Sequence, residues 1–164
     1  MSTQLKNLSD FSETDVPNAA PYHFGIVVAE WNRVITQALY EGACESLVDH
    51  GALPQNIYTY SVPGSFELTS GADILLKNRK LDAVICLGCV TQGETRHFEF
   101  ICNAVANGIS NVALKYSKPV IFGVLTTDNQ QQADDRAGGK HGNKGVEAAV
   151  TAIKMAYLAE TLNS

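Results

Sequence analysis

A histidine and the glycine-bearing segment in front of it are well suited to chemistry. Residues 88–95 read GCVTQGET and join an apolar run to a stretch with helical spacing. Glycines let the backbone approach a ligand closely, and the N–H groups at the start of a helix attract an anion. His97 follows in the expected first turn, where an imidazole could move protons near neutral pH. The pattern favours a phosphate-bearing substrate beside a proton-transfer group, although a lone histidine is more often structural.

Two other loops offer groups that could hold a polar, planar ligand. Ser65, Phe66 and Glu67 follow a Pro-Gly turn and open a helix, so backbone N–H groups and the Glu67 carboxylate could bind a polyol or an amide. Glu67 could equally complement the start of its helix. Trp31 is the only tryptophan and follows an apolar run directly, so it either faces a ligand or covers apolar surface at the rim.

Basic groups and one strand aromatic complete the candidates. Arg136, Lys140 and Lys144 are spread through a glycine-rich segment, and an arginine fork is a natural partner for a phosphate dianion. These three could also form a solvated surface cluster. Phe122 lies inside an apolar run, where an aromatic side chain usually belongs to the core.

Several other chemistries lack support. Glu94, His97 and Glu99 have no second histidine or cysteine pair at metal-ligand spacing, so we expect no metal. Cys86 and Cys89 have redox spacing, but three residues apart in a strand they would point to opposite faces, which favours buried, reduced thiols. Neither a Walker loop nor G-x-G-x-x-G occurs, so nucleotide triphosphates and dinucleotides are disfavoured.

The composition indicates one acidic globular domain. The chain has 164 residues, 45% of them hydrophobic, with 12 Lys and Arg against 17 Asp and Glu. A net charge of -5 without a basic cluster argues against nucleic acid as a partner. No apolar run reaches the ~20 residues of a membrane span and no secretion signal is evident, so we expect no membrane association and a cytoplasmic location. Residues 1–20 are polar and are expected to form a flexible tail or arm, and residues 21–164 a single domain.

Apolar runs alternate with stretches of helical spacing from residue 24 onwards. Strands are expected at 24–29, 56–62, 83–90 and 119–125, and helices from 33 to Gly51 and at 66–76, 94–114, 128–136 and 146–158. Residues 138–145, GGKHGNKG, should form a glycine-rich loop, and Asn32 a helix cap. The alternation predicts an α/β fold: a three-layer α/β/α sandwich of flavodoxin-like type with a central parallel four-stranded sheet. In such a sheet the loops after the four strands gather at one edge, where ligands bind.

Five segments occur in an order that resembles the lumazine synthase family. They are Trp31, SVPGSFEL (61–68), GCVTQGETRHFEF (88–100), PVIFGVLTT (119–127) and DDRAGGKHGNKG (134–145), and the resemblance covers nearly everything from Tyr22 to Glu160. It implies condensation of 5-amino-6-(D-ribitylamino)uracil with 3,4-dihydroxy-2-butanone 4-phosphate, the penultimate step of riboflavin biosynthesis. The products would be 6,7-dimethyl-8-ribityllumazine, phosphate and water, without a metal or organic cofactor.

The resemblance also implies a role for each candidate residue. His97 would be the catalytic proton shuttle, and Glu94, Thr95 and Arg136 would bind the butanone phosphate. The aminouracil would be bound by a larger set: Trp31, Ser65, Phe66, Glu67, Cys89, Val90, Thr91 and Phe122. In this family comparison Phe122 closes the pocket from an adjacent subunit, and phenylalanine often stands where this chain has Trp31.

The resemblance further implies a homo-oligomer and leaves other functions open. The family forms pentamers with active sites between subunits, and the short 138–145 loop is similar to members that assemble twelve pentamers into sixty-subunit shells. A riboflavin synthase could be a partner. The alternatives are a non-catalytic lumazine- or flavin-binding cage, the archaeal type of riboflavin synthase, and a flavodoxin-like electron-transfer module. An intact His97 and Arg136 argue against the first two, and the AEWNR loop after the first strand argues against the third.

Overall fold

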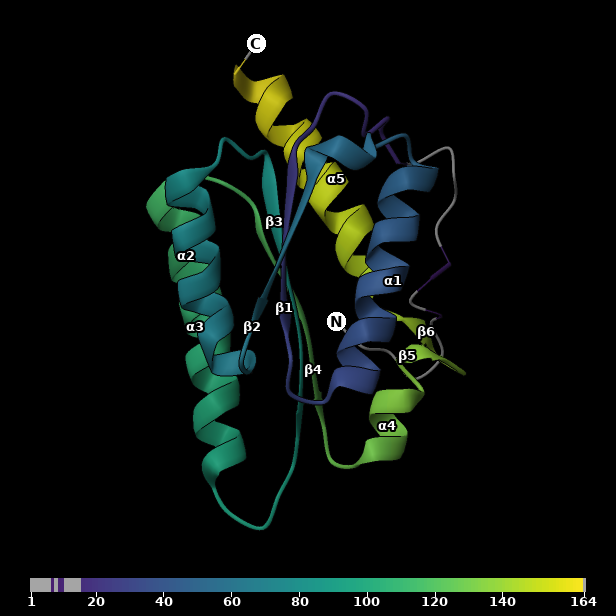
Figure 1. Ribbon diagram of the computed structural model, residues 1–164, viewed down its shortest axis with the longest axis vertical. Coiled ribbons are helices and arrows are strands. Elements are labelled where there is room, and N and C mark those ends of the chain that lie inside the picture. The colour runs from purple at the N-terminus through teal and green to yellow at the C-terminus, as the bar shows by residue number, and fades with distance from the viewer. Residues whose placement is uncertain (1–6, 8, 11–15, 164) are drawn as a thin grey trace.

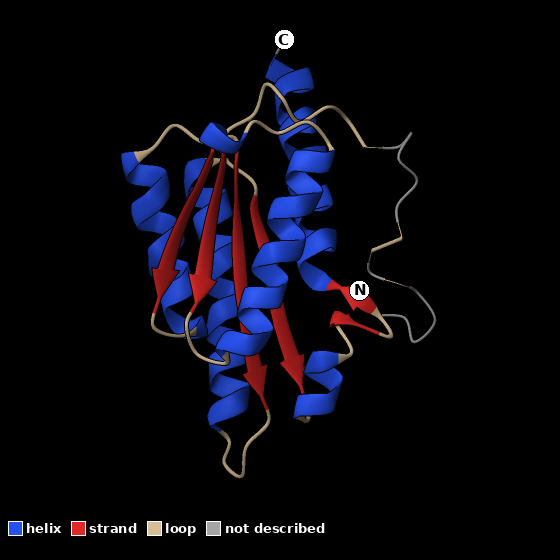
Figure 2. Ribbon diagram, turned by 45° about the vertical axis from the view of Figure 1, so that its right-hand side comes forward, coloured by secondary structure: helices blue, strands red, loops and turns tan. Residues whose placement is uncertain are grey.

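Four parallel strands form the centre of the molecule. The computed structural model describes residues 7, 9, 10 and 16–163. The strands are β1 (Phe24–Ala29), β2 (Ile57–Val62), β3 (Ala83–Thr91) and β4 (Val120–Thr127), in the order β2-β1-β3-β4. Figure 2 shows all four arrows pointing the same way, in agreement with their parallel registers. From β1 the chain first adds β2 on one side, and then adds β3 and β4 on the other side. The topological switch point therefore lies between β1 and β3.

Helices cover both faces of this sheet. In Figure 1, α1 (Arg33–Asp49) and α5 (Lys144–Asn163) lie on one side, together with the short α4 (Gln130–Asp134). The other side is covered by α2 (Leu68–Asn78) and α3 (His97–Tyr116). Short 3-10 turns, η2 (Pro54–Asn56) and η3 (Ser65–Glu67), flank β2. The predicted three-layer α/β/α sandwich around a four-stranded parallel sheet is confirmed.

Strand β3 explains why both faces must be covered. Its residues from Ala83 to Cys89 are all buried, because alternate side chains enter two different cores. Ile85, Leu87 and Cys89 pack with α1 and α5, whereas Val84 and Cys86 pack with α2 and α3. Cys86 and Cys89 therefore point to opposite faces, as predicted. All four cysteines are free thiols, although Cys44 and Cys102 are only partly buried.

The structure corrects three local predictions. The long helix begins at His97 rather than Glu94, because the Thr95 hydroxyl accepts the His97 N–H at 3.4 Å and the preceding glycine-bearing residues stay in a loop. The helix after β2 is preceded by the separate turn η3. The glycine-rich segment contains an antiparallel hairpin of β5 (Ala137–Gly139) and β6 (Gly142–Asn143), in which Gly138 and Gly142 adopt positive φ.

The segment before β1 contacts the domain in the part that is described. Ala19 is buried, and its N–H donates to the His50 carbonyl at 2.8 Å. The Ser9 hydroxyl accepts the Asn143 N–H at 2.9 Å. Residues 1–6, 8 and 11–15 of the expected tail lie outside the described residues, so the domain division at residue 20 stays a prediction.

Among the described helices, none is long and apolar enough to cross a membrane.

Candidate active site

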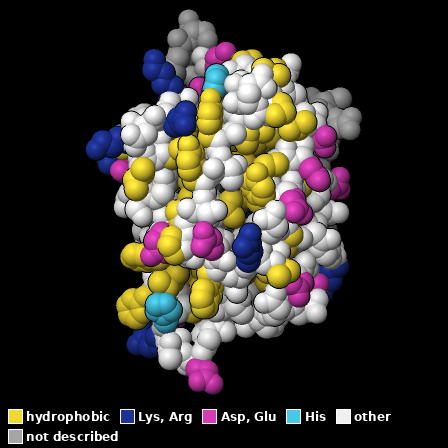
Figure 3. All heavy atoms as spheres, viewed as in Figure 1, with side chains coloured by type: hydrophobic (Ala, Val, Ile, Leu, Met, Phe, Trp, Pro, Cys, Tyr) yellow, Lys and Arg dark blue, Asp and Glu magenta, His cyan; other side chains and the backbone are white. Residues whose placement is uncertain are grey.

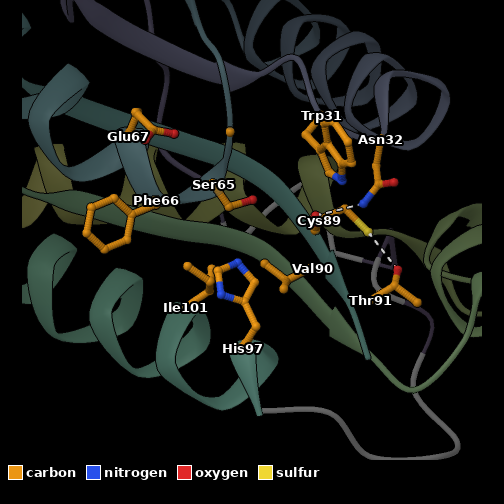
Figure 4. Close-up of a pocket in the computed structure, with 11 residues that line it drawn as sticks. Trp31, Asn32, Ser65, Phe66, Glu67, Cys89, Val90, Thr91, His97 and Ile101 are labelled. Carbon is orange, nitrogen blue, oxygen red and sulfur yellow. Dashed lines mark hydrogen bonds between the residues drawn. The ribbon is translucent and has the colours of Figure 1, made fainter. Parts of the chain in front are cut away.

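A cavity of about 590 Å³ lies at the carboxyl ends of β1, β2 and β3. Its walls come from the β1–α1 loop, η3, the end of β3 and the first turns of α3, as Figure 4 shows. This is the sheet edge where the loops were predicted to gather. The lining residues are Trp31, Asn32, Gly64, Ser65, Phe66, Glu67, Cys89, Val90, Thr91, His97 and Ile101.

Trp31 forms one wall of the cavity from the β1–α1 loop. Its side chain is 73% exposed, so little protein packs against it in this chain. The Trp31 N–H donates to the Pro63 carbonyl at 3.1 Å, and the Glu30 N–H donates to the Val62 carbonyl at 2.8 Å. These bonds join the loop to the end of β2. An exposed indole on an anchored loop presents a flat face for a planar ligand.

The turn η3 places Ser65 at the centre of the pocket wall. Ser65 is 6% exposed, and its hydroxyl is one of three buried side-chain groups without a hydrogen-bond partner among the described residues. A Cβ at Gly88 would lie 2.7 Å from the Ser65 Oγ, so only glycine in β3 lets η3 approach this closely. Figure 4 shows the Ser65 hydroxyl turned towards the side where Trp31 lies. A buried hydroxyl without a partner is costly unless a ligand or water satisfies it.

The end of β3 supplies a pocket wall that carries a thiol and a hydroxyl but no activated nucleophile. The Cys89 Sγ lies 3.9 Å from the Thr91 Oγ1. Burial raises the pKa of the Cys89 thiol, and the Thr91 hydrogen bond opposes that rise only in part. A thiol kept protonated is a poor nucleophile. Cys89 and Thr91 therefore shape and line the pocket.

His97 enters the cavity from the first residue of α3. In Figure 4 its imidazole lies in the pocket with Val90 and Ile101 beside it. Thr95, whose hydroxyl accepts the His97 N–H, and Glu94 are exposed residues of the loop before the helix and do not line the cavity. Among the ionisable side chains that line the cavity, the His97 imidazole is the best candidate for proton transfer. The Cys89 thiol is held protonated, and Glu67 lies on a different wall.

Arg136 and Phe122 lie outside the cavity of the single chain. The Arg136 Nη1 donates to the Gln132 carbonyl at 2.9 Å, at the end of α4. Phe122 lies in the edge strand β4 and is only partly buried, against the core on the α2 and α3 side. The structure thus brings together most of the predicted aminouracil set with His97, but not the arginine or the strand phenylalanine.

Comparison with known proteins identifies the family. The family model described as 6,7-dimethyl-8-ribityllumazine synthase matches residues 21–160. The chain belongs to the lumazine synthase family. It is 63% identical to the 6,7-dimethyl-8-ribityllumazine synthase of Cytophaga hutchinsonii, over 99% of this chain and 100% of the relative. It is 56% identical to the one from Parabacteroides distasonis, over 94% and 97%, and 54% identical to that of Flavobacterium johnsoniae, over 96% and 83%.

Three lining residues were not anticipated as part of a lumazine synthase pocket. Gly64 directly precedes Ser65, and Ile101 lies one helical turn after His97, so both positions could be inferred from predicted residues. Asn32 was predicted as a helix cap and does occupy that position, but its side chain makes no capping bond. Within the described residues, no three His, Cys, Asp or Glu side chains are grouped so as to hold a metal ion.

Proposed function

We propose that this protein condenses 5-amino-6-(D-ribitylamino)uracil with 3,4-dihydroxy-2-butanone 4-phosphate to give 6,7-dimethyl-8-ribityllumazine, phosphate and water. Family membership supports the reaction. The observation that assigns this reaction to a site is a cavity shared by four segments. Trp31, the turn η3, the end of β3 and His97 all line it. That cavity has room for a drug-sized ligand, since small-molecule sites commonly measure roughly 300–1,000 Å³.

The aminouracil is held by the aromatic and hydroxyl-bearing walls. Trp31 stacks on the pyrimidine, and Ser65, Phe66 and Glu67 bind the ribityl chain through backbone N–H, hydroxyl and carboxylate groups. The partnerless Ser65 hydroxyl supports this assignment, because a sugar hydroxyl would satisfy it. Cys89 to Thr91 line the same pocket.

The butanone phosphate binds next to the start of α3. Glu94 and Thr95 supply backbone and hydroxyl donors, and Arg136 supplies the positive charge. The exposure of Glu94 and Thr95 supports this role, since a phosphate can reach them from solvent. The segment precedes a helix of 20 residues, whose dipole favours an anion at that end.

His97 moves protons while the two substrates react. The amine attacks the ketone and a Schiff base forms with loss of one water, phosphate then leaves, and ring closure by the ribitylamino nitrogen expels a second water. Much of the acceleration comes from holding the two reactants together, because effective molarities in such sites are large. The protein needs no metal or organic cofactor in this scheme.

We further propose that the complete site is shared between subunits of a homo-oligomer, a pentamer that can assemble into a sixty-subunit shell. Arg136 and Phe122 lie outside the cavity of their own chain, and Phe122 is half-buried on an edge strand. Large apolar side chains are exposed on the α2 and α3 layer, among them Ile74, Phe100 and Leu114. Figure 3 shows hydrophobic side chains at several places on one surface of the single chain. A riboflavin synthase partner and a cytoplasmic location remain predictions of the sequence.

Mixed oligomers test the shared site. His97→Ala and Arg136→Ala chains are co-expressed with different tags, and assemblies containing both are purified and assayed at low substrate. If one chain supplies His97 and its neighbour Arg136, about a quarter of the sites in a random mixture have both groups. The mixture should then exceed either parent several-fold. Activity no higher than the average of the parents would place both groups in one chain.

Trp31 provides a direct test of the aminouracil subsite. As the only tryptophan, its fluorescence should be quenched when the aminouracil is added, and not when inorganic phosphate is added. Trp31→Phe should keep affinity within a few-fold, whereas Trp31→Ala should weaken it about tenfold or more. Equal binding by the Ala variant would remove Trp31 from the subsite.

A further inference from the structure

The residue after Trp31 has an unusual backbone conformation. Asn32 has φ 59° and ψ 45°, in the left-handed region, and among the described residues only Ser117 is another non-glycine with positive φ. Asparagine tolerates this region better than most residues with a side chain. The Asn32 carbonyl accepts the N–H groups of Ile35 and Thr36, so the turn at Asn32 leads directly into α1.

The Asn32 side chain leaves its own helix and crosses to β3. An asparagine at a helix N-cap normally accepts a backbone N–H of the first turn, but Asn32 makes no such bond. Its Nδ2 instead donates to the Cys89 carbonyl at 3.0 Å, a contact drawn in Figure 4. The last paired residues of β1 and β3 are Val28 and Leu87. The side chain therefore continues the connection between these strands beyond the point where their pairing ends.

This bond fixes the loop of Trp31 from a second side. Backbone N–H groups of Glu30 and Trp31 already join the loop to the end of β2 and the residue after it. Asn32 joins the same loop to the end of β3, which carries the adjoining wall of the cavity. The indole is 73% exposed, so its direction depends on the backbone more than on neighbouring side chains.

We propose that Asn32 is a positioning residue that sets the separation between the Trp31 face and the Cys89–Thr91 wall, and thereby the affinity for the planar substrate. The inference depends on the proposed function only in naming that substrate as the aminouracil. The positioning itself is a property of the folded chain. Losing the Asn32 bond should leave the phosphate subsite unaffected, because Glu94 and Thr95 lie in a different loop.

Three substitutions separate the side-chain bond from the backbone conformation. Asn32→Asp has nearly the same shape and tolerates positive φ, but an ionised carboxylate cannot donate to the Cys89 carbonyl. Asn32→Gly adopts positive φ freely and has no side chain. Asn32→Ala loses the bond and strains the turn. The control is Asn78→Asp, which removes an Nδ2 bond to the Ile74 carbonyl at the end of α2.

The readouts are Trp31 fluorescence without ligand, thermal unfolding, and steady-state kinetics. We expect Asn32→Asp and Asn32→Gly to change the emission and acrylamide quenching of Trp31 while keeping a melting temperature close to that of the unmodified protein. The KM for the aminouracil should rise about tenfold, the effect of losing one hydrogen bond. The KM for the butanone phosphate and kcat should change less than about threefold. Asn78→Asp should change none of these values.

Three outcomes would overturn the inference. Unchanged Trp31 fluorescence in both variants would show that Asn32 does not position the indole. A changed fluorescence with an unchanged aminouracil KM would show that the position does not matter for binding. If Asn32→Gly matched the unmodified protein while Asn32→Ala failed, the backbone conformation alone would be responsible. A protein without turnover would refute the proposed function instead, since the fluorescence comparison needs no substrate.

Discussion

At the scale of single residues, the proposed chemistry depends on one imidazole and one guanidinium that the chain holds in different places. His97 lines the cavity, whereas Arg136 is attached to the end of α4 through the Gln132 carbonyl. We therefore expect the two groups to have separable roles. In the proposed reaction His97 would transfer protons, and Arg136 would bind the charged phosphate of one substrate.

Replacing His97 by Ala should slow turnover without abolishing it. Proton transfer by a positioned side chain contributes roughly 10²–10⁴-fold, and the positioning of the two substrates by the remaining pocket is retained. We expect kcat to fall about 100-fold, with both KM values within a few-fold of the original. A loss of all activity above the uncatalysed reaction would contradict this division.

Replacing Arg136 by Gln should act mainly on the butanone phosphate. Its KM should rise by about 10–100-fold, because a charge-assisted bond to phosphate is lost, while the aminouracil KM stays within a few-fold. Arg136→Lys retains the charge but not the two-pronged geometry. Its KM for the butanone phosphate should lie between those of the unmodified protein and the Gln variant. Steady-state kinetics with each substrate varied in turn checks this. Equal increases in both KM values would mean that Arg136 supports the fold rather than the phosphate.

Sequence patterns located the pocket's residues better than they described the bonds between them. Trp31, Ser65 and His97 each follow a strand in sequence, and the carboxyl ends of parallel strands meet, so their convergence could be predicted. The Asn32 bond could not, because it joins residues 57 apart at a carbonyl that has no sequence pattern. The positions of Arg136 and Phe122 relative to the pocket depend on tertiary packing that periodicity does not encode.

At the scale of elements, close contacts at glycines hold the hairpin and α5 against α1. The Asn143 side chain donates to the Ala38 carbonyl at 2.9 Å and accepts the Gly145 N–H at 2.7 Å. A Cβ at Gly42 would lie 2.6 Å from the Asn143 Nδ2, and a Cβ at Gly145 would overlap the Leu39 carbonyl. Both glycines are therefore required by packing between α1 and the start of α5.

Gly145→Ala should destabilise the protein strongly. Its Cβ meets backbone atoms that cannot move without shifting α1 against α5, and such overpacking costs about 3 kcal/mol. The matched control is Gly93→Ala, because nothing lies within 4 Å of a Cβ there. Denaturant unfolding of both variants measures the difference. A Gly145 variant as stable as the Gly93 variant would show that the α1–α5 contact is adaptable.

Element boundaries were less predictable than element types. The continuous apolar runs of β1 and β3 correctly indicated strands buried on both faces. The start of α3 was predicted three residues too early, because helical spacing says nothing about the Thr95 hydroxyl that accepts the His97 N–H. The β5–β6 hairpin was predicted as a loop, since its few glycine-rich residues have no strand periodicity.

At the scale of the whole molecule, Tyr22 joins the segment before β1 to the last turns of α5. Its hydroxyl donates to the Glu160 carboxylate at 2.5 Å, 138 residues away. Burial first, and then the hydrogen bond to Glu160, raises the pKa of Tyr22 to about 12. The folded protein therefore disfavours the tyrosinate more strongly than the unfolded chain does, in which tyrosine has a pKa of about 10.

This shift predicts the alkaline limit of stability. The contribution of Tyr22 is complete below pH 10 and is lost as pH rises through the folded pKa of about 12. Burial raises the pKa of the Cys86 thiol to about 12 as well, which adds a loss in the same direction from about pH 9. The urea concentration at the unfolding midpoint should fall as pH rises from 8 to 12. In Tyr22→Phe this midpoint should fall less steeply above pH 10. An unchanged slope in Tyr22→Phe would refute the assignment.

The central claim is that this pocket accelerates the condensation itself, and a turnover assay tests it most directly. The purified protein is mixed with both substrates, and the fluorescent lumazine and free phosphate are followed together, with His97→Ala as the control. We predict equimolar lumazine and phosphate, formed faster than in the spontaneous reaction and about 100-fold more slowly with the variant. Tight binding of the lumazine without acceleration would contradict the account and indicate a storage cage.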